Sequence, residues 1–372
     1  MTSRAHVAGW GKYVPERVLT NDDLTQMVET SDEWIRSRTG ILERRIASDS
    51  DTTASMAIEA AHEAIEMAGI RPSDIDMIIV ATCTPDHVFP STACLVQDAI
   101  GATHAAAFDV AAGCSGFVYG LSVAADLIAA EAYQTALVIG AETLSRIVDW
   151  EDRATCVLFG DGAGAVILRS NGADGGILSS VLGSDGSGGD LLHLPAGGSR
   201  HPASHHTVSE RMHFLKMKGR EVFRFAVSVM PDATRQVLGQ AGLTLEEVSL
   251  IIPHQANRRI TNASVKALGL PEDRIYSNVE RYGNTSAASI PIALCEAVEE
   301  DRVHRDDLVV LVGFGAGLTW AASAVRWSAP LPTIRPARWE KAWYGIRYRY
   351  AAIRSLARRV IRWIAARFSR DE

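Results

Sequence analysis

One cysteine in this sequence stands where an apolar stretch meets a helix, a position suited to nucleophilic chemistry. Cys114 follows the apolar run that ends at Gly113 and precedes residues 116–130, which have the small apolar residues of a packed helix. Unpaired N–H groups and the helix dipole at such a position favour the thiolate. We therefore predict that Cys114 is a nucleophile. The alternative from this stretch alone is an ordinary buried cysteine that packs as a small apolar residue.

Two further polar residues occupy corners between predicted strands and helices. His254 comes directly after an apolar strand that ends near Ile252, and Asn284 lies in a Gly/Asn turn that opens a helix. A single histidine after a strand is more often structural. However, ligands collect at the carboxyl ends of strands in α/β sheets, so three such corners together favour one site that contains Cys114, His254 and Asn284.

Two other stretches could bind substrate. Residues 313–320 form a glycine-rich turn between two predicted strands, and its backbone N–H groups could stabilise an oxyanion. This turn lacks the GxGxxG pattern and precedes a strand, so it is not a dinucleotide fingerprint. Residues 31–40 carry Trp34, Arg36 and Arg38, which could stack on a nucleotide base and pair with phosphates. A solvated helix end is the alternative for that stretch.

Composition limits the class of protein. The 372 residues are 47% hydrophobic, which is ample for two packed α/β halves. Five scattered cysteines show no CxxC pair or metal-ligand spacing, which predicts a reducing compartment, no disulfide framework and no metal site. The sequence starts without an apolar signal region and has no uninterrupted apolar run long enough to span a membrane, so we expect a cytoplasmic protein.

The chain shows an internal duplication. Residues 68–79 and 241–252 each read as a helix end, a polar loop and an apolar strand in the same register. Further predicted strands at 76–83, 136–140, 164–168, 308–312 and 318–325 alternate with helical patterns such as 52–69. We predict two α/β halves, 1–172 and 218–330, joined by a substrate-facing flap at 173–217 because 183–207 is rich in Gly, Ser and His.

Six segments in this order carry a family resemblance: DVAAGCSGF, DRATCVLFGDGAGA, MKGREVFRFAV, PHQANRRI, GNTSAASIP and GFGAGLTW. From the N-terminus to about Trp327 the chain resembles β-ketoacyl-ACP synthase III, a condensing enzyme. The resemblance implies the thiolase-like fold, with two duplicated halves in five layers, αβαβα. It also implies a homodimer that uses acyl-CoA and malonyl-ACP, needs no cofactor and binds no nucleic acid.

The resemblance assigns roles to individual residues. It implies a catalytic triad of Cys114, His254 and Asn284, with the backbone N–H groups of Cys114 and Ala316 as the oxyanion hole. Many members have glycine where Ala316 stands, and alanine leaves the N–H available if its φ is negative. Phe89 resembles the residue that closes the partner's acyl pocket. The residues implied to bind CoA or substrate are Trp34, Arg38, Thr39, Arg153, Phe159, Met217, Gly219, Asn257 and Arg259.

The implied reaction is a decarboxylative Claisen condensation that starts fatty-acid synthesis. A degradative thiolase would normally carry a second cysteine near the C-terminal glycines, and residues 313–320 contain none. A non-catalytic partner subunit would lack the nucleophile. A specialised condensing enzyme or acyltransferase of secondary metabolism would keep the same triad, so the sequence does not separate it from the first reading. Primer chain length and branching are also left open.

The tail lies outside the resemblance. Residues 331–372 contain eleven Lys and Arg against three Asp and Glu, a net charge of +8, which leaves −15 for residues 1–330. Apolar residues from Ile346 to Phe368 recur at helical spacing between arginines such as Arg347 and Arg367, and Trp339, Trp343 and Trp363 add aromatic rings. The pattern predicts a basic amphipathic extension that contacts anionic membranes through 339–370. Packing on the chain's own acidic body or its dimer mate, or recruitment of an acidic carrier protein, are the alternatives.

Overall fold

Two sheets form the centre of the protein. The computed structural model describes residues 4–170, 174–328 and 338–368. The first sheet has the order β1-β7-β6-β4-β5 and contains β1 Ala5–Tyr13, β4 Met77–Ala81, β5 Ala106–Val110, β6 Thr135–Glu142 and β7 Gly162–Ser170. The second has the order β11-β12-β13-β8 and contains β8 Gly176–Ser184, β11 Leu250–Pro253, β12 Leu308–Gly315 and β13 Thr319–Arg326.

The predicted duplication is visible in both halves. Helix α3 (Thr53–Ala68) leads through a short loop into β4, and α8 (Gly219–Gln240) leads in the same way into β11. Each of these strands pairs in parallel with a neighbour, β4 with β6 at Ile79–Val138 and β11 with β12 at Ile252–Leu311. The two segments that echo each other in the sequence therefore occupy equivalent places in the two halves.

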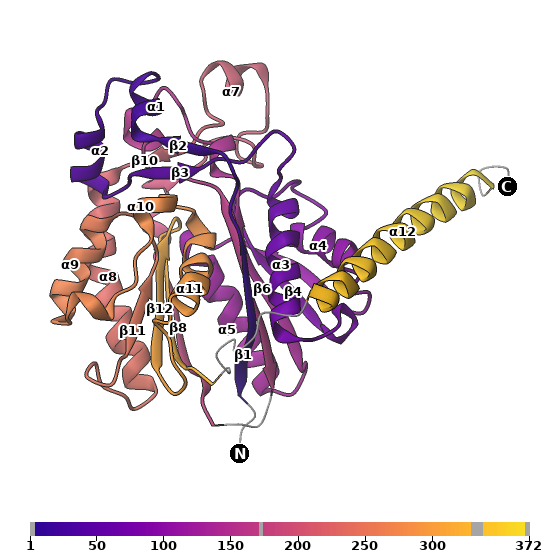
Figure 1. Cartoon of the computed structure of the whole chain (residues 1–372). Coiled ribbons are helices and arrows are strands. Elements are labelled where there is room, and N and C mark those ends of the chain that lie inside the picture. Colours follow the sequence, from indigo (N-terminus) through magenta and orange to yellow (C-terminus); the bar gives the residue numbers. More distant parts are fainter. Residues whose placement is uncertain (1–3, 171–173, 329–337, 369–372) are drawn as a thin grey trace.

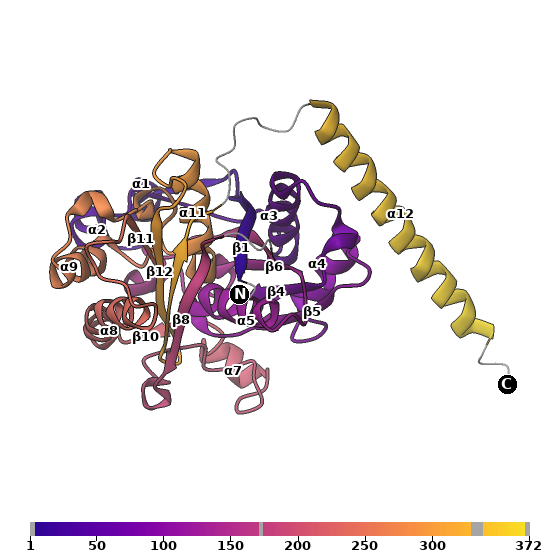
Figure 2. The same ribbon diagram turned by 90° about the horizontal axis from the view of Figure 1, so that it is seen from below.

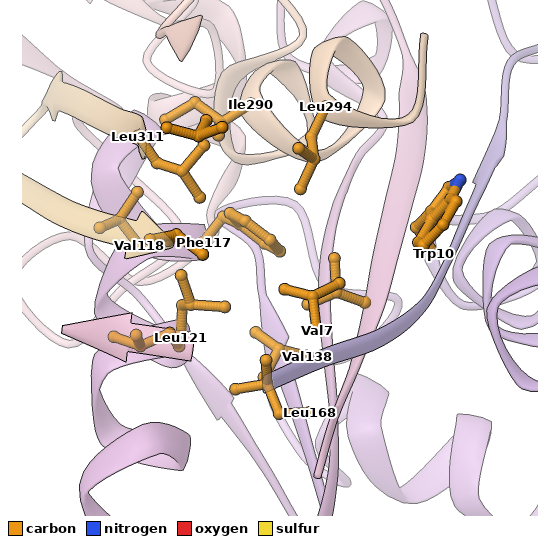
Figure 3. Close-up of a cluster of buried hydrophobic side chains, with 14 of the residues drawn as sticks. Val7, Trp10, Phe117, Val118, Leu121, Val138, Leu168, Ile290, Leu294 and Leu311 are labelled. Carbon is orange, nitrogen blue, oxygen red and sulfur yellow. The ribbon is translucent and has the colours of Figure 1, made fainter. Parts of the chain in front are cut away.

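The helices complete five layers (Figures 1 and 2). Helices α5 (Gly116–Ala129) and α11 (Ser289–Glu299) lie between the sheets, where Phe117, Ile290 and Leu294 pack against strand residues such as Val138 and Leu311 (Figure 3). Helices α3 and α4 (Thr92–Ile100) cover the outer face of the first sheet, and α8 and α9 (Arg258–Leu268) cover that of the second. The predicted αβαβα thiolase-like architecture is confirmed.

Small residues bring the outer helix α3 close to the first sheet. A Cβ added at Gly9 would lie 2.4 Å from the carbonyl oxygen of Ala64, and one added at Gly11 would lie 2.5 Å from that of Ala60. The side chain of Thr52 caps the start of α3, and Gly69 ends it in a left-handed conformation. The alanines on this helix are therefore explained by the short distance to β1.

The segment predicted as a connecting flap differs in part from the expectation. Residues 176–184 are not a loop but strand β8, which pairs antiparallel with β13 along its length. Serine and glycine at five of its nine positions weaken the local strand signal, and the long-range pairing with β13 fixes the extended conformation. The remainder, up to residue 217, is mostly irregular and contains α7 (His205–Ser209) and the short pair β9 (Leu192–His193) and β10 (Lys216–Met217).

The remaining elements are short. Strands β2 (Val18–Thr20) and β3 (Glu43–Arg45) form a small antiparallel pair. The other short helices are α1 Asn21–Thr25, α2 Asp32–Thr39, α6 Arg153–Cys156 and α10 Val279–Tyr282. The 3-10 turns are η1 Pro72–Asp74, η2 Gly113–Ser115, η3 Leu144–Arg146, η4 Gly186–Gly188, η5 Glu272–Arg274 and η6 Ser286–Ala288.

The predicted C-terminal extension is a helix, α12 (Arg338–Phe368). Its first part lies against α3 and α4, and the rest projects away from the body of the protein (Figures 1 and 2). Trp339, Trp343, Arg347, Arg367 and Phe368, which contributed to the prediction, lie outside the residues whose side chains the structure describes.

Candidate active site

Cys114 lies in a buried turn at the end of β5. The turn η2 follows this strand and runs directly into α5, and only 6% of Cys114 is exposed. Gly113 opens the turn with a φ of 56°, and a Cβ at this position would lie 2.7 Å from the backbone nitrogen of Ala316. Glycine is therefore required here both for the backbone conformation and for the approach of the β12–β13 turn.

The protonation state of Cys114 differs from the expectation. Burial raises the pKa of its thiol to about 12, although a hydrogen bond with the side chain of Ser286 acts in the opposite direction. The prediction that the helix start would favour a thiolate is wrong for the free protein, because α5 begins two residues later at Gly116 and desolvation has the larger effect. Cys114 is therefore a neutral thiol in the free protein.

The β12–β13 turn lies directly against the cysteine. A Cβ at Gly315 would lie 2.4 Å from the backbone nitrogen of Cys114. The hydroxyl of Ser115 donates to Thr319 Oγ1 at 2.8 Å, which ties the two turns together. Ala316 does not have a positive φ, so the alanine leaves its N–H available as the resemblance requires. The backbones of the two turns that carry Cys114 and Ala316 are thereby held close together.

His254 follows β11 and is held by the neighbouring strand. Its backbone N–H donates to the carbonyl of Val312 at 2.8 Å, and its ring packs edge to face on Phe314 with centroids 5.2 Å apart. Burial lowers the pKa of His254 to about 3, so the imidazole is neutral at physiological pH. Its Nδ1 is buried and has no hydrogen-bond partner among the described residues.

Asn284 lies between α10 and η6, and its amide orientation is fixed by the backbone. Its side-chain Oδ1 accepts a hydrogen bond from the backbone N–H of Ser286 at 2.9 Å. The backbone N–H of Asn284 donates to the carbonyl of Leu158 at 2.8 Å. With Oδ1 occupied, the Nδ2 group is the part of the amide that remains for a ligand. Because Ser286 contacts both Asn284 and Cys114, these two residues belong to one site.

Comparison with known proteins identifies the family of the chain. A family model described as 3-oxoacyl-[acyl-carrier-protein (ACP)] synthase III matches residues 108–186, and the model of the C-terminal part of the same enzyme matches residues 238–327. The β-ketoacyl-[acyl-carrier-protein] synthase III of Caldanaerobacter subterraneus subsp. tengcongensis is 56% identical over 324 residues, which are 87% of this chain and 98% of that protein. The chain belongs to the 3-oxoacyl-ACP synthase III family.

Solved structures of synthase III show the same fold. The 3-oxoacyl-[acyl-carrier-protein] synthase III of Aquifex aeolicus is 49% identical, with a TM-score of 0.81 over 87% of this chain and all of that one. The priming β-ketosynthase of the R1128 polyketide pathway is 35% identical with the same TM-score, over 89% of this chain and 99% of that one. The family model ends at residue 327, so helix α12 lies beyond it.

The residues expected to bind CoA in a synthase III come from both halves of the chain. The guanidinium of Arg153 stacks 4.9 Å from the centre of the Trp34 ring. The guanidinium of Arg259, at the start of α9, lies 5.5 Å from the centre of the Phe223 ring on α8. Helix α2, which carries Trp34 and the exposed Arg38, contacts α9. The structure therefore brings the aromatic and basic residues of the two halves close to each other.

The other predicted binding residues differ in their availability. Asn257 caps α9 through Oδ1, which leaves its Nδ2 for a ligand. Phe159 is buried and pairs through its backbone with Asn284. Met217 is half-buried and Gly219 is exposed where α8 begins. Thr39 is buried, and its hydroxyl is already engaged by the backbone of Ile35 and Ile41, so the structure gives it a local role within α2.

A buried carboxylate behind the site was missed by the sequence analysis. Glu142, at the end of β6, accepts hydrogen bonds from Thr84 Oγ1 at 2.6 Å, Ser286 Oγ at 3.0 Å and the backbone N–H of Cys83 at 3.0 Å. Burial raises the pKa of Glu142, and these donors oppose the shift. Glu142 thereby fixes Ser286, which in turn contacts Cys114 and Asn284. An acidic residue at the end of an otherwise uncharged, largely apolar strand was the available signal.

Replacing Glu142 with glutamine is expected to disturb this arrangement. The Gln amide offers an N–H₂ group where a carboxylate oxygen accepted, and the loss of a hydrogen bond to a charged group costs about 2 kcal/mol. We expect kcat for condensation to fall by roughly thirtyfold with little change in KM. Steady-state kinetics of the purified variant checks this.

The matched control is Glu296→Gln, which alters a buried, hydrogen-bonded carboxylate on α11 that contacts Lys12 and Asn278 instead of the site. Both variants should lower the midpoint of thermal unfolding, whereas only Glu142→Gln should lower kcat. Equal kcat values for the two variants would show that Glu142 has only a structural role.

Proposed function

We propose that this protein condenses an acyl-CoA primer with malonyl-ACP, with loss of CO₂, as the first carbon–carbon bond-forming step of fatty-acid synthesis. The observation that supports this most directly is the combination of a buried cysteine, a histidine held neutral and an asparagine with its Nδ2 free. A nucleophile with two non-titrating hydrogen-bond donors suits acyl transfer followed by stabilisation of an enolate. We propose that the reaction needs no cofactor, since CoA is part of the substrate. We also propose that the protein is cytoplasmic.

The first half-reaction acylates the cysteine. The Sγ atom of Cys114 bonds to the thioester carbon, the carbon–sulfur bond to CoA breaks, and the thiol proton ends on the CoA sulfur. The backbone N–H groups of Cys114 and Ala316 hold the oxyanion that forms on the way. In the binding region, Trp34 and Arg153 would stack on the base, and Arg38, Asn257 and Arg259 would bind the polar parts of CoA.

The second half-reaction forms the new carbon–carbon bond. The bond between the malonyl methylene and its carboxylate breaks and releases CO₂, and the electron pair attacks the acyl carbon. The carbon–Sγ bond to Cys114 then breaks, and the thiolate takes up a proton. His254 Nε2 and Asn284 Nδ2 donate to the malonyl thioester oxygen while it carries negative charge. Neutral donors suit this step because they stay fixed and need no change of protonation.

We further propose that two copies of the chain assemble through the edge of the first sheet. Strand β5 is the last strand of that sheet and has no neighbour on its outer side among the described residues, and Phe108 on it is partly exposed. Val88 and Phe89 on the loop before α4 are 86% and 84% exposed. Such large apolar side chains beside an open sheet edge favour an interface, where Phe89 would close the partner's acyl pocket.

The test of this function is condensation of a panel of acyl-CoA primers with malonyl-ACP. We expect β-ketoacyl-ACP and CO₂ to form in equal amounts with at least one short primer. A product only with unusual primers or a different acceptor would assign the protein to the specialised condensing enzymes of secondary metabolism. Failure of every primer to acylate the protein would contradict the proposed function.

A further inference from the structure

Helix α12 is fixed to the protein by one of its faces. The ring of Tyr348 stacks on His62 of α3 with centroids 3.6 Å apart. One and two turns further along, Ala351 is buried and Ser355 donates a hydrogen bond to Asp98 of α4. These residues lie on one side of the helix, so the opposite side must face away from the protein.

That opposite side carries an apolar stripe. Its side chains recur at helical spacing and are each between 42% and 66% exposed: Ile346, Tyr350, Ile353, Val360, Ile361 and Ile364. Eighteen residues of helix correspond to about 27 Å. An exposed apolar surface of this length is uncommon on a protein that has no partner for it. We name these six residues the outer stripe.

The charges around the outer stripe are of one sign. Residues 346–368 contain seven arginines and no acidic residue. Arg349 and Arg358 are exposed and Arg354 is half-exposed, and they flank the outer stripe on both sides. The helix projects from the body of the protein, whose residues 1–330 carry a net charge of −15 (Figure 2). The basic and apolar surface is therefore presented away from the acidic one.

The pattern along α12 argues against the same helix of a second copy as the occupant. Beyond Ser355, the side that docks on α4 continues with Arg359, which still reaches Asp98 at 3.4 Å, and then Arg362. Val360, Ile361 and Ile364 of the second half lie instead on the outer stripe, continuous with the residues of the first half. Pairing of two such stripes would bring rows of arginines together without acidic partners. Anionic lipid supplies both an apolar layer and negative headgroups.

We propose that α12 binds the surface of anionic membranes. The outer stripe enters the boundary between headgroups and acyl chains, and Arg349, Arg354 and Arg358 bind headgroup phosphates. Among the described residues no helix is both long enough and apolar enough to cross a bilayer, so the contact is peripheral. This inference does not depend on the proposed function, because none of these residues belongs to the active site.

The test is co-sedimentation of the full-length protein with vesicles. One set contains phosphatidylcholine alone, and the other contains equal parts of phosphatidylcholine and phosphatidylglycerol. We expect binding to the anionic vesicles only, weakened by added salt because headgroup attraction is screened. Ile353→Asp with Ile361→Asp should reduce the partition coefficient by roughly tenfold or more, since it removes apolar burial. Arg349→Glu with Arg358→Glu should reduce it similarly.

Matched controls use exposed residues on the body. Val18→Asp on β2 and the pair Arg169→Glu with Arg305→Glu change hydropathy and charge equally per site, and should bind vesicles like the unaltered protein. All variants should retain condensation activity. Equal vesicle binding by the outer-stripe variant and the unaltered protein would overturn the proposal. So would a larger assembly lost only in that variant, or a raised KM for malonyl-ACP in the arginine variant without any vesicle binding.

Discussion

Cys114→Ala should prevent any acyl group from becoming attached to the protein. The Sγ atom is the proposed nucleophile between the turn η2 and the β12–β13 turn, and alanine leaves the backbone there unchanged. Intact-protein mass spectrometry after incubation with acyl-CoA measures the result directly. The unaltered protein should gain one acyl mass, and the variant should gain none.

Cys83 provides the matched control for this experiment. Its backbone N–H donates to Glu142, and its thiol is close enough to Cys114 for the two to interact electrostatically. Cys83→Ala therefore tests whether this neighbouring thiol takes part in acylation. We expect the variant to be acylated on Cys114 at the rate of the unaltered protein. Acylation of Cys114→Ala at the rate of the unaltered protein would contradict the assignment of the nucleophile, and with it the proposed first half-reaction.

His254→Ala and Asn284→Ala should separate the two half-reactions. Both variants should still be acylated, because the proposed role of these residues begins when malonyl-ACP binds. A donor in an oxyanion site contributes about 3 kcal/mol to transition-state stabilisation, so CO₂ release should fall by roughly two to three orders of magnitude in each. Acylation is followed by mass spectrometry, and decarboxylation is followed by release of labelled CO₂.

Asn278→Ala is the matched control for the asparagine. Asn278 is also buried, and its amide donates to Glu296 at 2.9 Å. Its loss should lower stability without a selective effect on decarboxylation. Normal CO₂ release from His254→Ala or Asn284→Ala would remove that residue from the proposed mechanism, and loss of acylation in either would place its role earlier in the reaction.

The fold was predictable because the duplication is visible in local sequence patterns. The helix end, loop and strand at 68–79 and 241–252 depend on short-range signals such as Gly69 and the apolar residues of β4 and β11. Strand β8 was missed because its extended conformation depends on pairing with β13, which follows more than 130 residues later. Local propensity is weak for such a strand.

The candidate site was predictable in its residues more than in its electrostatics. Motifs identified Cys114, His254 and Asn284, but the pKa of the thiol depends on the amount of desolvation, which only the packed structure reveals. Glu142 was missed for a related reason. Its partners Thr84 and Ser286 lie 58 and 144 residues away in the sequence, so no local spacing indicates the network.

Packing of the middle helix layer affects the alignment of the candidate site residues. Helix α5 emerges from the turn that carries Cys114, and α11 begins a few residues after Asn284, so the same two helices that fill the space between the sheets also set the alignment of these two residues. A change of volume at Phe117 or Ile290, two buried residues of the core, would tilt one helix against the other (Figure 3). Sequence change in the two duplicated halves is therefore constrained where α5 and α11 pack together, because neither half contains all of the candidate site residues.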